Sequence, residues 1–178
     1  MLRDYGIKYR AMSADVDEGK VQRSIKNPTP EKTACQLAFA KARAVLPRVK
    51  NGIVIGADTI VVIKDRIIGK PDSLKHAEKI ISDLSHNEHR VITGICLLDA
   101  ATMKMVVDYE VTRVRFKKLD KKWIKEYVRN NNVMDKAGAY AIQENRDPLI
   151  RSVKGSYNNV VGFPIEKVLK ILKGWDNF

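Results

Sequence analysis

A single carboxylate, Asp58, interrupts the apolar run of residues 55–62 (Ile-Gly-Ala-Asp-Thr-Ile-Val-Val). An ionised carboxylate without a partner is costly in a protein core, so Asp58 needs a cation, a hydrogen-bond network or a role in a reaction. The plainer alternative is a buried aspartate that is satisfied by a neighbouring lysine or by backbone N–H groups. The residue types leave both interpretations open.

Two lysines are candidates for that cation. After Asp58, a short polar turn and the apolar pair Ile67-Ile68 return the chain to Gly69-Lys70-Pro71, which is the pattern of a β-hairpin. A hairpin of that length would set Lys70 near the end of the sheet that carries Asp58. Lys41 falls on the apolar stripe of a predicted helix, where a lysine either extends its charge to solvent or meets an anion.

The elements that would hold these side chains follow from capping residues and periodicity. Thr29 and Pro30 are typical of a helix start, and Pro47 ends that helix after about Leu46. The other predicted elements are a helix from Asp72 or Ser73 packing through Leu74, Ala77, Ile81 and Leu84, strands over 91–98 and 103–117, a helix capped by Asp120 with Trp123, Ile124, Tyr127 and Val128 buried, and a helix from Pro164 to Gly174 burying Ile165, Val168, Leu169 and Leu172. This order, without a regular βαβ repeat, predicts an α/β fold with a mixed sheet.

Two further segments are polar where a plain core segment would be apolar. Residues 135–143 (Asp-Lys-Ala-Gly-Ala-Tyr-Ala-Ile-Gln) join an acid and a base to small residues that let a backbone or a ligand come close. An ion pair with tight packing is the alternative. Residues 155–164 form a polar turn that leads into a helix, and an ordinary loop is the alternative there.

The composition limits the class of protein. A chain of 178 residues suits one domain or two small lobes that share a core. Its two cysteines and three histidines lack metal-ligand spacing, so the cysteines are expected to be buried thiols of a reducing compartment. The sequence has neither a membrane-spanning apolar run nor the layout of a signal peptide. We therefore expect a cytoplasmic protein without a membrane partner.

The net charge of +12 would attract polyanions. Arg113, Arg115 and Lys117 alternate with Thr112, Val114 and Phe116, so they share one face of a strand. Aromatic residues are not interleaved with them as a base-stacking platform requires, so we expect a solvated face and no nucleic-acid partner. A nucleic-acid surface stays the alternative.

Seven short strings follow one another over nearly the whole chain. They are residues 13–18 (Ser-Ala-Asp-Val-Asp-Glu), 56–59 (Gly-Ala-Asp-Thr), 69–71 (Gly-Lys-Pro), 93–94 (Thr-Gly), 112–116 (Thr-x-Val-x-Phe), 135–140 (Asp-Lys-Ala-Gly-Ala-Tyr) and 155–162 (Gly-Ser-Tyr-Asn-Asn-Val-Val-Gly). In order and spacing they resemble those of Maf-like nucleoside triphosphate pyrophosphatases, the family of the septum formation protein Maf.

The resemblance implies an activity and a fold. The family cleaves nucleotides between the α and β phosphates, releasing a monophosphate and pyrophosphate, and uses a divalent metal, usually Mg²⁺ or Mn²⁺. The implied fold is that of the inosine triphosphate pyrophosphatases: one elongated α/β domain over residues 1–178, in which a twisted mixed β-sheet with flanking helices carries a cleft between two lobes.

The resemblance also implies roles for the charged residues. Asp58 matches the family's proton acceptor, which deprotonates the attacking water or holds the metal that does so. Glu18 matches a metal-binding or catalytic carboxylate, and Mg²⁺ favours such oxygen ligands while keeping several waters. Lys41 and Lys70 resemble the lysines that neutralise the triphosphate as charge builds on the leaving pyrophosphate.

Four residues are assigned to substrate binding by the same resemblance: Asp135, Lys136, Thr59 and Gln143. A threonine directly after the catalytic aspartate and a glutamine after the 135–140 string typify the branch that acts on dTTP and UTP. The amide of Gln143 suits the polar edge of a pyrimidine, because it offers both a donor and an acceptor. Ala141 departs from the glycine that many members have.

The start of the chain also departs from the family. Family members open with a strand and a Ser-x-Ser-Pro-Arg-Arg loop that grips the phosphates, and residues 1–7 match the segment after that loop. A late start, a truncation and a natural variant are open explanations. Without the loop we expect a sheet one strand shorter, weak nucleotide binding and slow turnover, since each charge-assisted arginine contact is worth about 1.5–3 kcal/mol.

A second class of function stays open beside the enzyme. It is a non-catalytic nucleotide- or nucleic-acid-binding regulator of cell division, as the family name implies, whose binding would depend steeply on salt and not on Asp58. A pyrophosphatase would instead lose its activity in Asp58→Asn. An exposed sheet edge makes a homodimer the expected assembly.

Overall fold

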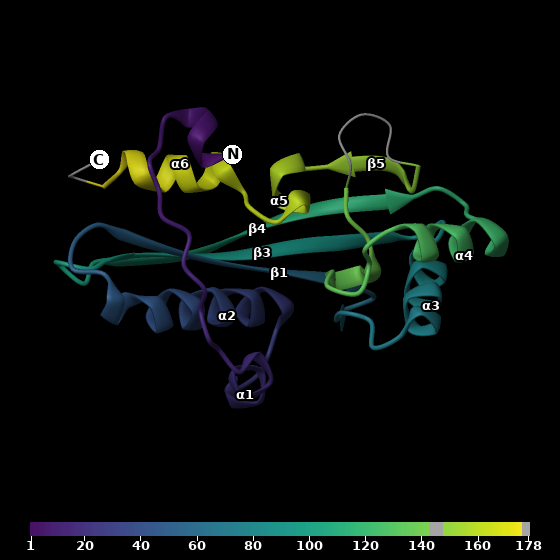
Figure 1. Ribbon diagram of the computed structural model, residues 1–178, viewed down its shortest axis with the longest axis horizontal. Helices are drawn as coiled ribbons and strands as arrows, with labels where there is room; N and C mark the ends of the chain where they lie inside the picture. Colours follow the sequence, from purple (N-terminus) through teal and green to yellow (C-terminus); the bar gives the residue numbers. More distant parts are fainter. Residues whose placement is uncertain (143–147, 176–178) are drawn as a thin grey trace. The chain divides into compact units, whose positions relative to one another are not determined.

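The computed structural model describes residues 1–142 and 148–175 (Figure 1). The helical elements in these residues are η1 (Leu2–Tyr5), α1 (Glu18–Ser24), α2 (Pro30–Val45), η2 (Leu46–Arg48), α3 (Leu74–Leu84), α4 (Lys121–Asn130), η3 (Ala137–Ala139), α5 (Tyr157–Val161) and α6 (Ile165–Lys173). The strands are β1 (Ile53–Ile63), β2 (Arg66–Ile68), β3 (Glu88–Asp99), β4 (Met105–Phe116) and β5 (Ile150–Lys154). They form one sheet in the order β2-β1-β3-β4-β5.

The predicted α/β class is confirmed, but the sheet is antiparallel where we expected mixed strand directions. The reason lies in its connections. β1 joins β2, and β3 joins β4, through short turns, which reverse the chain. The start of β1 meets the end of β3, where Ala100 N donates a 3.0 Å hydrogen bond to Gly52 O.

The chain divides into two compact units. The first unit comprises Met1–Asp58, Thr93–Glu110 and the C-terminal residues from Gly162, and the second comprises Thr59–Ile92 and Val111–Val161. β1, β3 and β4 each contribute residues to both units. The arrangement of two lobes around one cleft stays a prediction.

In the first unit, α2 and α6 cover opposite faces of the strands (Figure 1). Alternate β1 residues point to each side. Val54 packs with Cys96 under α2, whereas Ile53 and Ile55 join the apolar cluster that includes Val168 of α6. The side of β1 on which a residue lies therefore decides which helix it meets.

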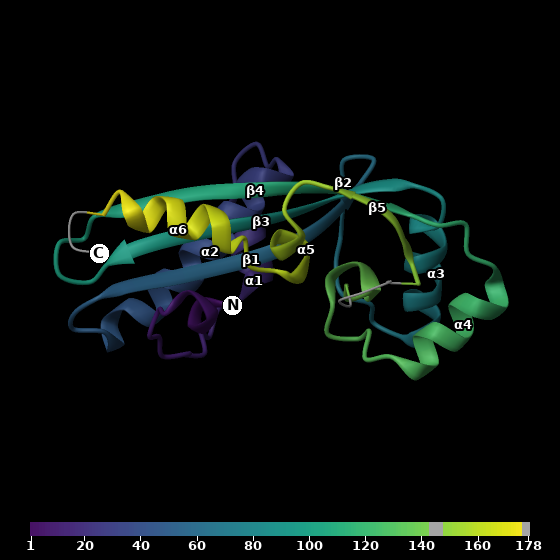
Figure 2. The same cartoon turned by 90° about the horizontal axis from the view of Figure 1, so that it is seen from above.

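The second unit has its own apolar core. α3 and α4 lie side by side (Figures 1 and 2) and pack with η3, the second halves of β1 and β4, and the first half of β3. Phe116, Ile81 and Leu84 are among its fully buried side chains. This core holds the segment that follows α4.

Capping residues predicted the helix starts well. Thr29, Ser73 and Asp120 each accept a hydrogen bond from the backbone N–H three residues ahead, at 3.2, 3.2 and 2.9 Å. The predicted packing of α3 through Leu74 is wrong: Leu74 is exposed, and Ile80 is buried instead. Leu74 is the first residue of its helix, where the core-facing stripe has not yet begun.

Among the described α-helices and strands, three short ones were not predicted: α1, β5 and α5. α1 buries no residue and β5 has no fully buried position, so neither shows the apolar periodicity that marks longer elements. Within the described residues, no helix is long and apolar enough to cross a membrane.

Candidate active site

Asp58 lies on β1 with its side chain on the face that α2 covers. Side chains alternate along a strand, so Asp58 shares this face with Val54 and Gly56. The residue is buried, with 8% of its surface exposed. The sequence pattern therefore correctly indicated a carboxylate inside an apolar layer.

Two glycines let α2 rest directly on that layer. A Cβ at Gly56 would lie 2.2 Å from Ala38 O, and a Cβ at Gly94 would lie 2.3 Å from Ala34 O. Contacts that short are sterically forbidden, so any larger residue at either position would push the helix away from the sheet. The close approach sets how far a side chain of α2 must reach to meet β1.

Lys41 of α2 makes that reach and joins two carboxylates. Its Nζ donates to Asp58 Oδ1 at 2.5 Å and lies 2.8 Å from Glu18 Oε1. Exposure rises across the cluster, with side-chain values of 9% for Asp58, 26% for Lys41 and 42% for Glu18. The structure thus brings together three of the residues that the sequence singled out, and Lys41 meets an anion.

The Lys41 ammonium is held in its charged form. Burial by itself disfavours the charge, but the hydrogen bonds to Asp58 and Glu18 outweigh it, and the Lys41 pKa lies above its ordinary value. Lys41 is therefore a fixed cation at neutral pH. It neutralises one carboxylate and leaves the three-residue cluster with a surplus negative charge.

Glu18 reaches the cluster from the start of α1. Asp17 caps this helix by accepting a 2.8 Å hydrogen bond from Lys20 N, and Glu18 is the first helical residue. An acidic side chain is favourable at that end of a helix. The string at residues 13–18 therefore holds Glu18 in place through the helix cap formed by Asp17.

The donor set around Lys41 is one that suits Mg²⁺ or Mn²⁺. The described residues contain no cluster of three or more His, Cys, Asp or Glu side chains able to hold a metal. Glu18 and Asp58 nevertheless share one cation, Lys41, and so present oxygen atoms to a common point. Mg²⁺ is commonly held by one or two carboxylates together with waters and substrate phosphates, and the pair fits that pattern.

Thr59 and Lys70 belong to the second unit, at the β1–β2 hairpin. The turn residues at 64–65 both have positive φ, as a two-residue type I′ turn requires, and the hairpin prediction is confirmed. The antiparallel register pairs Val61 with Ile68. The pairing ends there, so Lys70 follows β2 by two residues, as Thr59 precedes the paired part of β1 by two.

Asp135 and Lys136 precede η3 in the second unit. Lys136 Nζ lies 3.1 Å from Asp135 Oδ1, so the ion pair that we weighed as the alternative does form, on a partly exposed surface. The segment continues through Gly138, whose N–H donates to Gly69 O at 3.3 Å. This contact links the segment to the residue before Lys70. Gln143 lies outside the described residues.

Comparison with known proteins places these residues in a family. The Maf-like protein family model matches residues 1–175. The chain belongs to the Maf-like protein family. It is 38% identical over 173 residues to a dTTP/UTP pyrophosphatase of Ruminiclostridium cellulolyticum and 40% identical over 173 residues to one of Pelotomaculum thermopropionicum. Each alignment covers 97% of this chain and 88% of the relative.

Another similar protein, the dTTP/UTP pyrophosphatase of Clostridioides difficile, is 36% identical over 173 residues, covering 97% of this chain and 87% of its own. The family membership agrees with the resemblance seen in the sequence. The roles of the individual residues stay predictions, because the comparisons match whole chains.

One string of this Maf-like chain proves to be structural in a way that sequence reasoning missed. We expected either a functional turn or an ordinary loop at residues 155–164, but Asn159 is fully buried in α5. Its Nδ2 donates to Val91 O and to Thr112 Oγ1, both at 3.0 Å, and Thr112 Oγ1 donates to Ser156 O. The buried side-chain amide of Asn159 thus connects the string at residues 155–162 to the string at residues 112–116.

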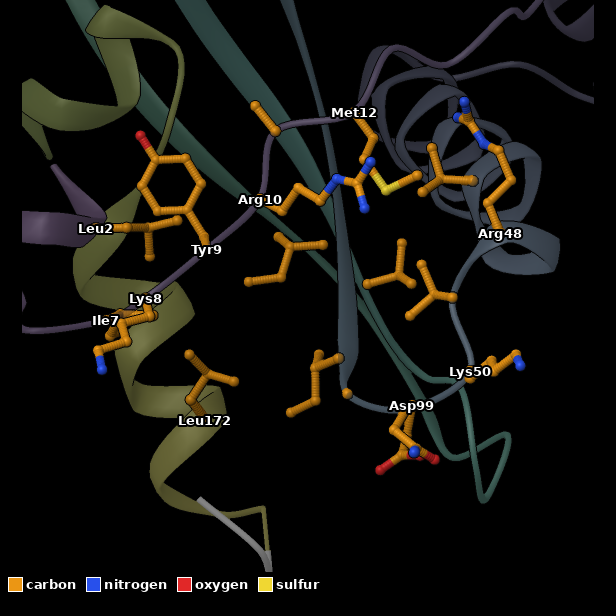
Figure 3. Close-up of a pocket in the computed structure, with 18 of the residues that line it drawn as sticks. Leu2, Ile7, Lys8, Tyr9, Arg10, Met12, Arg48, Lys50, Asp99 and Leu172 are labelled. Atoms are coloured by element: carbon orange, nitrogen blue, oxygen red, sulfur yellow. The ribbon is translucent and has the colours of Figure 1, made fainter.

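The first unit of the Maf-like chain also has a cavity of about 990 Å³ (Figure 3). Arg48 lies on one side of it and Leu172 on the other, and successive β1 residues 53–55 line it, so it follows an edge of the strand. Asp58 and Lys41 are not in its described lining. In the described sheet, β2 covers that edge only at Val61–Ile63, and the homodimer predicted from an open edge stays a prediction.

Proposed function

We propose that this chain is a nucleoside triphosphate pyrophosphatase that hydrolyses dTTP and UTP to the monophosphate and pyrophosphate. Family membership and the printed names of relatives at 36–40% identity support the reaction and the substrate class. The observation that carries the proposal is the cluster in which Lys41 joins Asp58 and Glu18.

Asp58 is the proposed proton acceptor. A water attacks the α phosphorus, the bond to the bridging oxygen breaks, and pyrophosphate leaves with the electron pair of that bond. The water's proton passes to an Asp58 oxygen. A carboxylate held in a mostly buried layer is suited to this step, because few waters compete for its lone pairs.

Lysines would balance the charge that builds on the leaving pyrophosphate. Lys41 is a fixed cation beside the proposed base, and its contact with Asp58 also holds the carboxylate in one orientation. Lys70 and Lys136 are the proposed phosphate contacts of the second unit. Lys136 is already paired with Asp135, which we propose orients it.

Glu18 and Asp58 would hold the divalent cation, Mg²⁺ or Mn²⁺. When bound, the ion would neutralise phosphate charge and acidify a coordinated water. The surplus negative charge of the cluster favours such an ion. Glu18 and Asp58 would supply carboxylate oxygens as ligands, and the same two carboxylates are paired with Lys41.

Thr59 and Gln143 are the proposed contacts for the base. Thr59 follows the proposed proton acceptor on β1, and its side chain lies on the opposite strand face, the one that carries Val61. Val61 in turn packs against Gly138 of the 135–140 segment, since a Cβ at Gly138 would lie 3.0 Å from Val61 Cγ2. We further propose that the protein works in the cytoplasm as a homodimer.

The test is pyrophosphate release from a panel of nucleoside triphosphates with Mg²⁺, using the wild type and Asp58→Asn. We expect turnover of dTTP and UTP that disappears in the variant. Asp108→Asn is the matched control, because Asp108 is likewise a strand carboxylate, on β4, and is paired with a lysine, Lys167, at 3.4 Å. Equal activity in the wild type and Asp58→Asn would overturn the proposal, and salt-sensitive binding of RNA without hydrolysis would favour the binding protein instead.

A further inference from the structure

We infer that His89 is a positioning residue for nucleotide binding: through Tyr140 it holds the segment 135–140, and with it the loop of Lys70, in the conformation that meets the substrate. The inference rests on the proposed function and deepens it. His89 was not among the candidates from the sequence, which showed only a histidine without metal-ligand spacing.

His89 is enclosed in the core of the second unit. It lies near the start of β3 with 2% of its surface exposed. Its ring meets Phe116 edge-to-face at a centroid distance of 5.0 Å and Tyr140 at 5.5 Å, and Phe116 meets Tyr140 in the same way at 4.9 Å. The three rings form one aromatic cluster from two strands and the 135–140 segment.

One hydrogen bond ties this cluster to the segment. His89 Nε2 lies 2.8 Å from Tyr140 Oη, while His89 Nδ1 has no hydrogen-bond partner in the described part of the chain. A buried polar atom without a partner is costly, and a leucine or phenylalanine would fill the same space without that cost. The bond to Tyr140 is therefore what a histidine provides here and an apolar residue does not.

The segment needs such a tie because its backbone is not in its locally preferred conformation. Gly138 and Ala139 both lie in the left-handed region, with φ of 74° and 57°. An alanine in this region is unfavourable and persists only where surrounding contacts impose it. Tyr140, the next residue, is anchored to His89 immediately after this turn.

The tie extends to the hairpin loop. Gly138 N donates to Gly69 O at 3.3 Å, so the left-handed turn also fixes the backbone beside Lys70. The proposed phosphate contact Lys136 lies two residues before Gly138, and Ala139 N donates back to its carbonyl oxygen at 3.1 Å. Releasing Tyr140 from His89 would therefore loosen both lysines together without removing either.

The experiment compares His89→Leu, His89→Gln and Tyr140→Phe in the full chain with UTP and Mg²⁺. We expect His89→Leu and Tyr140→Phe each to raise KM about tenfold, the worth of one hydrogen bond, with kcat changed less than about twofold. His89→Gln can still bond to Tyr140 and should restore much of the wild-type KM. The double variant His89→Leu/Tyr140→Phe should be no worse than either single variant.

A control separates positioning from loss of stability. Val128→Ala opens the same core from α4, where Val128 is 1% exposed, and should lower the melting temperature without changing KM. If the His89 variants behave like Val128→Ala, or if Tyr140→Phe leaves KM unchanged, the inference is overturned.

A second readout does not depend on activity. Amide hydrogen exchange at Gly138 should accelerate at least about tenfold in His89→Leu and stay near wild type in Val128→Ala. If the wild type releases no pyrophosphate, the proposed function fails, and the exchange rates still decide whether His89 holds the segment. Unchanged exchange in His89→Leu would refute the positioning role by itself.

Discussion

Acid should destabilise this protein through His89 before most carboxylates are protonated. Burial lowers the His89 pKa from 6.5 to about 4, so the folded state favours the neutral ring. Unfolding frees the ring to take up a proton below pH 6.5. The contribution of the neutral His89 ring to the free energy of unfolding is therefore fully present above about pH 6.5. It falls as the pH drops, and below about pH 4 nothing further is lost from this group. The full loss is about 3 kcal/mol, of which about 2 kcal/mol has gone at pH 5.

Urea unfolding followed by tryptophan fluorescence at pH 7.5 and pH 5 measures this loss. His89→Gln is the control, because it keeps a side chain that can bond to Tyr140 and has no titrating ring. Both proteins contain the same carboxylates, so the effect of carboxylate protonation on the free energy of unfolding cancels in the comparison. We expect the wild type to lose about 2 kcal/mol more than His89→Gln between the two pH values. Equal losses in the two proteins would refute the reasoning.

Three other predictions concern the first unit. Lys41→Met should lower the free energy of unfolding by about 2–3 kcal/mol at pH 7, since it strands the buried Asp58 charge, and urea unfolding at pH 7 and pH 4 should show the deficit shrinking in acid; a constant deficit would mean lost packing instead. Gly56→Ala should lower the free energy of unfolding by about 2 kcal/mol or more and reduce pyrophosphate release, because its Cβ would meet Ala38 O. Gly69→Ala is the control and should leave the free energy of unfolding unchanged, since the space around its Cβ is open. Equal free energies of unfolding in the two variants would contradict this reasoning. Mg²⁺ at about ten times its Kd should raise the melting temperature of the wild type by a few degrees, and a shift of the same size in Glu18→Gln would exclude Glu18 as a ligand.

Long elements were predictable because their signals are local. The helix around Lys41 was read from Thr29, Pro30 and Pro47, and it runs from Pro30 to Val45 as expected. The β1–β2 hairpin followed from the spacing of two apolar runs. β5 gave no such signal, because its pairing with β4 involves only Arg113–Phe116 and depends on contacts distant in sequence. The direction of the sheet strands also depended on connections rather than on composition.

The site divides in the same way. Asp58 and Lys41 stood out because each places a charge on an apolar face, and a misplaced charge is visible in one sequence. Glu18 was identified by resemblance alone, since an exposed glutamate at a helix start is ordinary. Gly56 and Gly94 had no physical reason until α2 was seen on the sheet, because a glycine's role as a contact surface depends on what packs against it.

The cluster bears on the two interpretations that the sequence left open for Asp58. A buried aspartate needs one cation to be satisfied, and Lys41 supplies it at 2.5 Å. This pair alone satisfies the plainer interpretation, which requires no second carboxylate, although a second one is also attracted to the Lys41 ammonium. Glu18 is nevertheless held 2.8 Å from the same ammonium by a separately capped helix. With both carboxylates ionised, the cluster carries one negative charge more than Lys41 neutralises, and the proposed divalent cation rests on this surplus. The catalytic role of Asp58 stays a prediction.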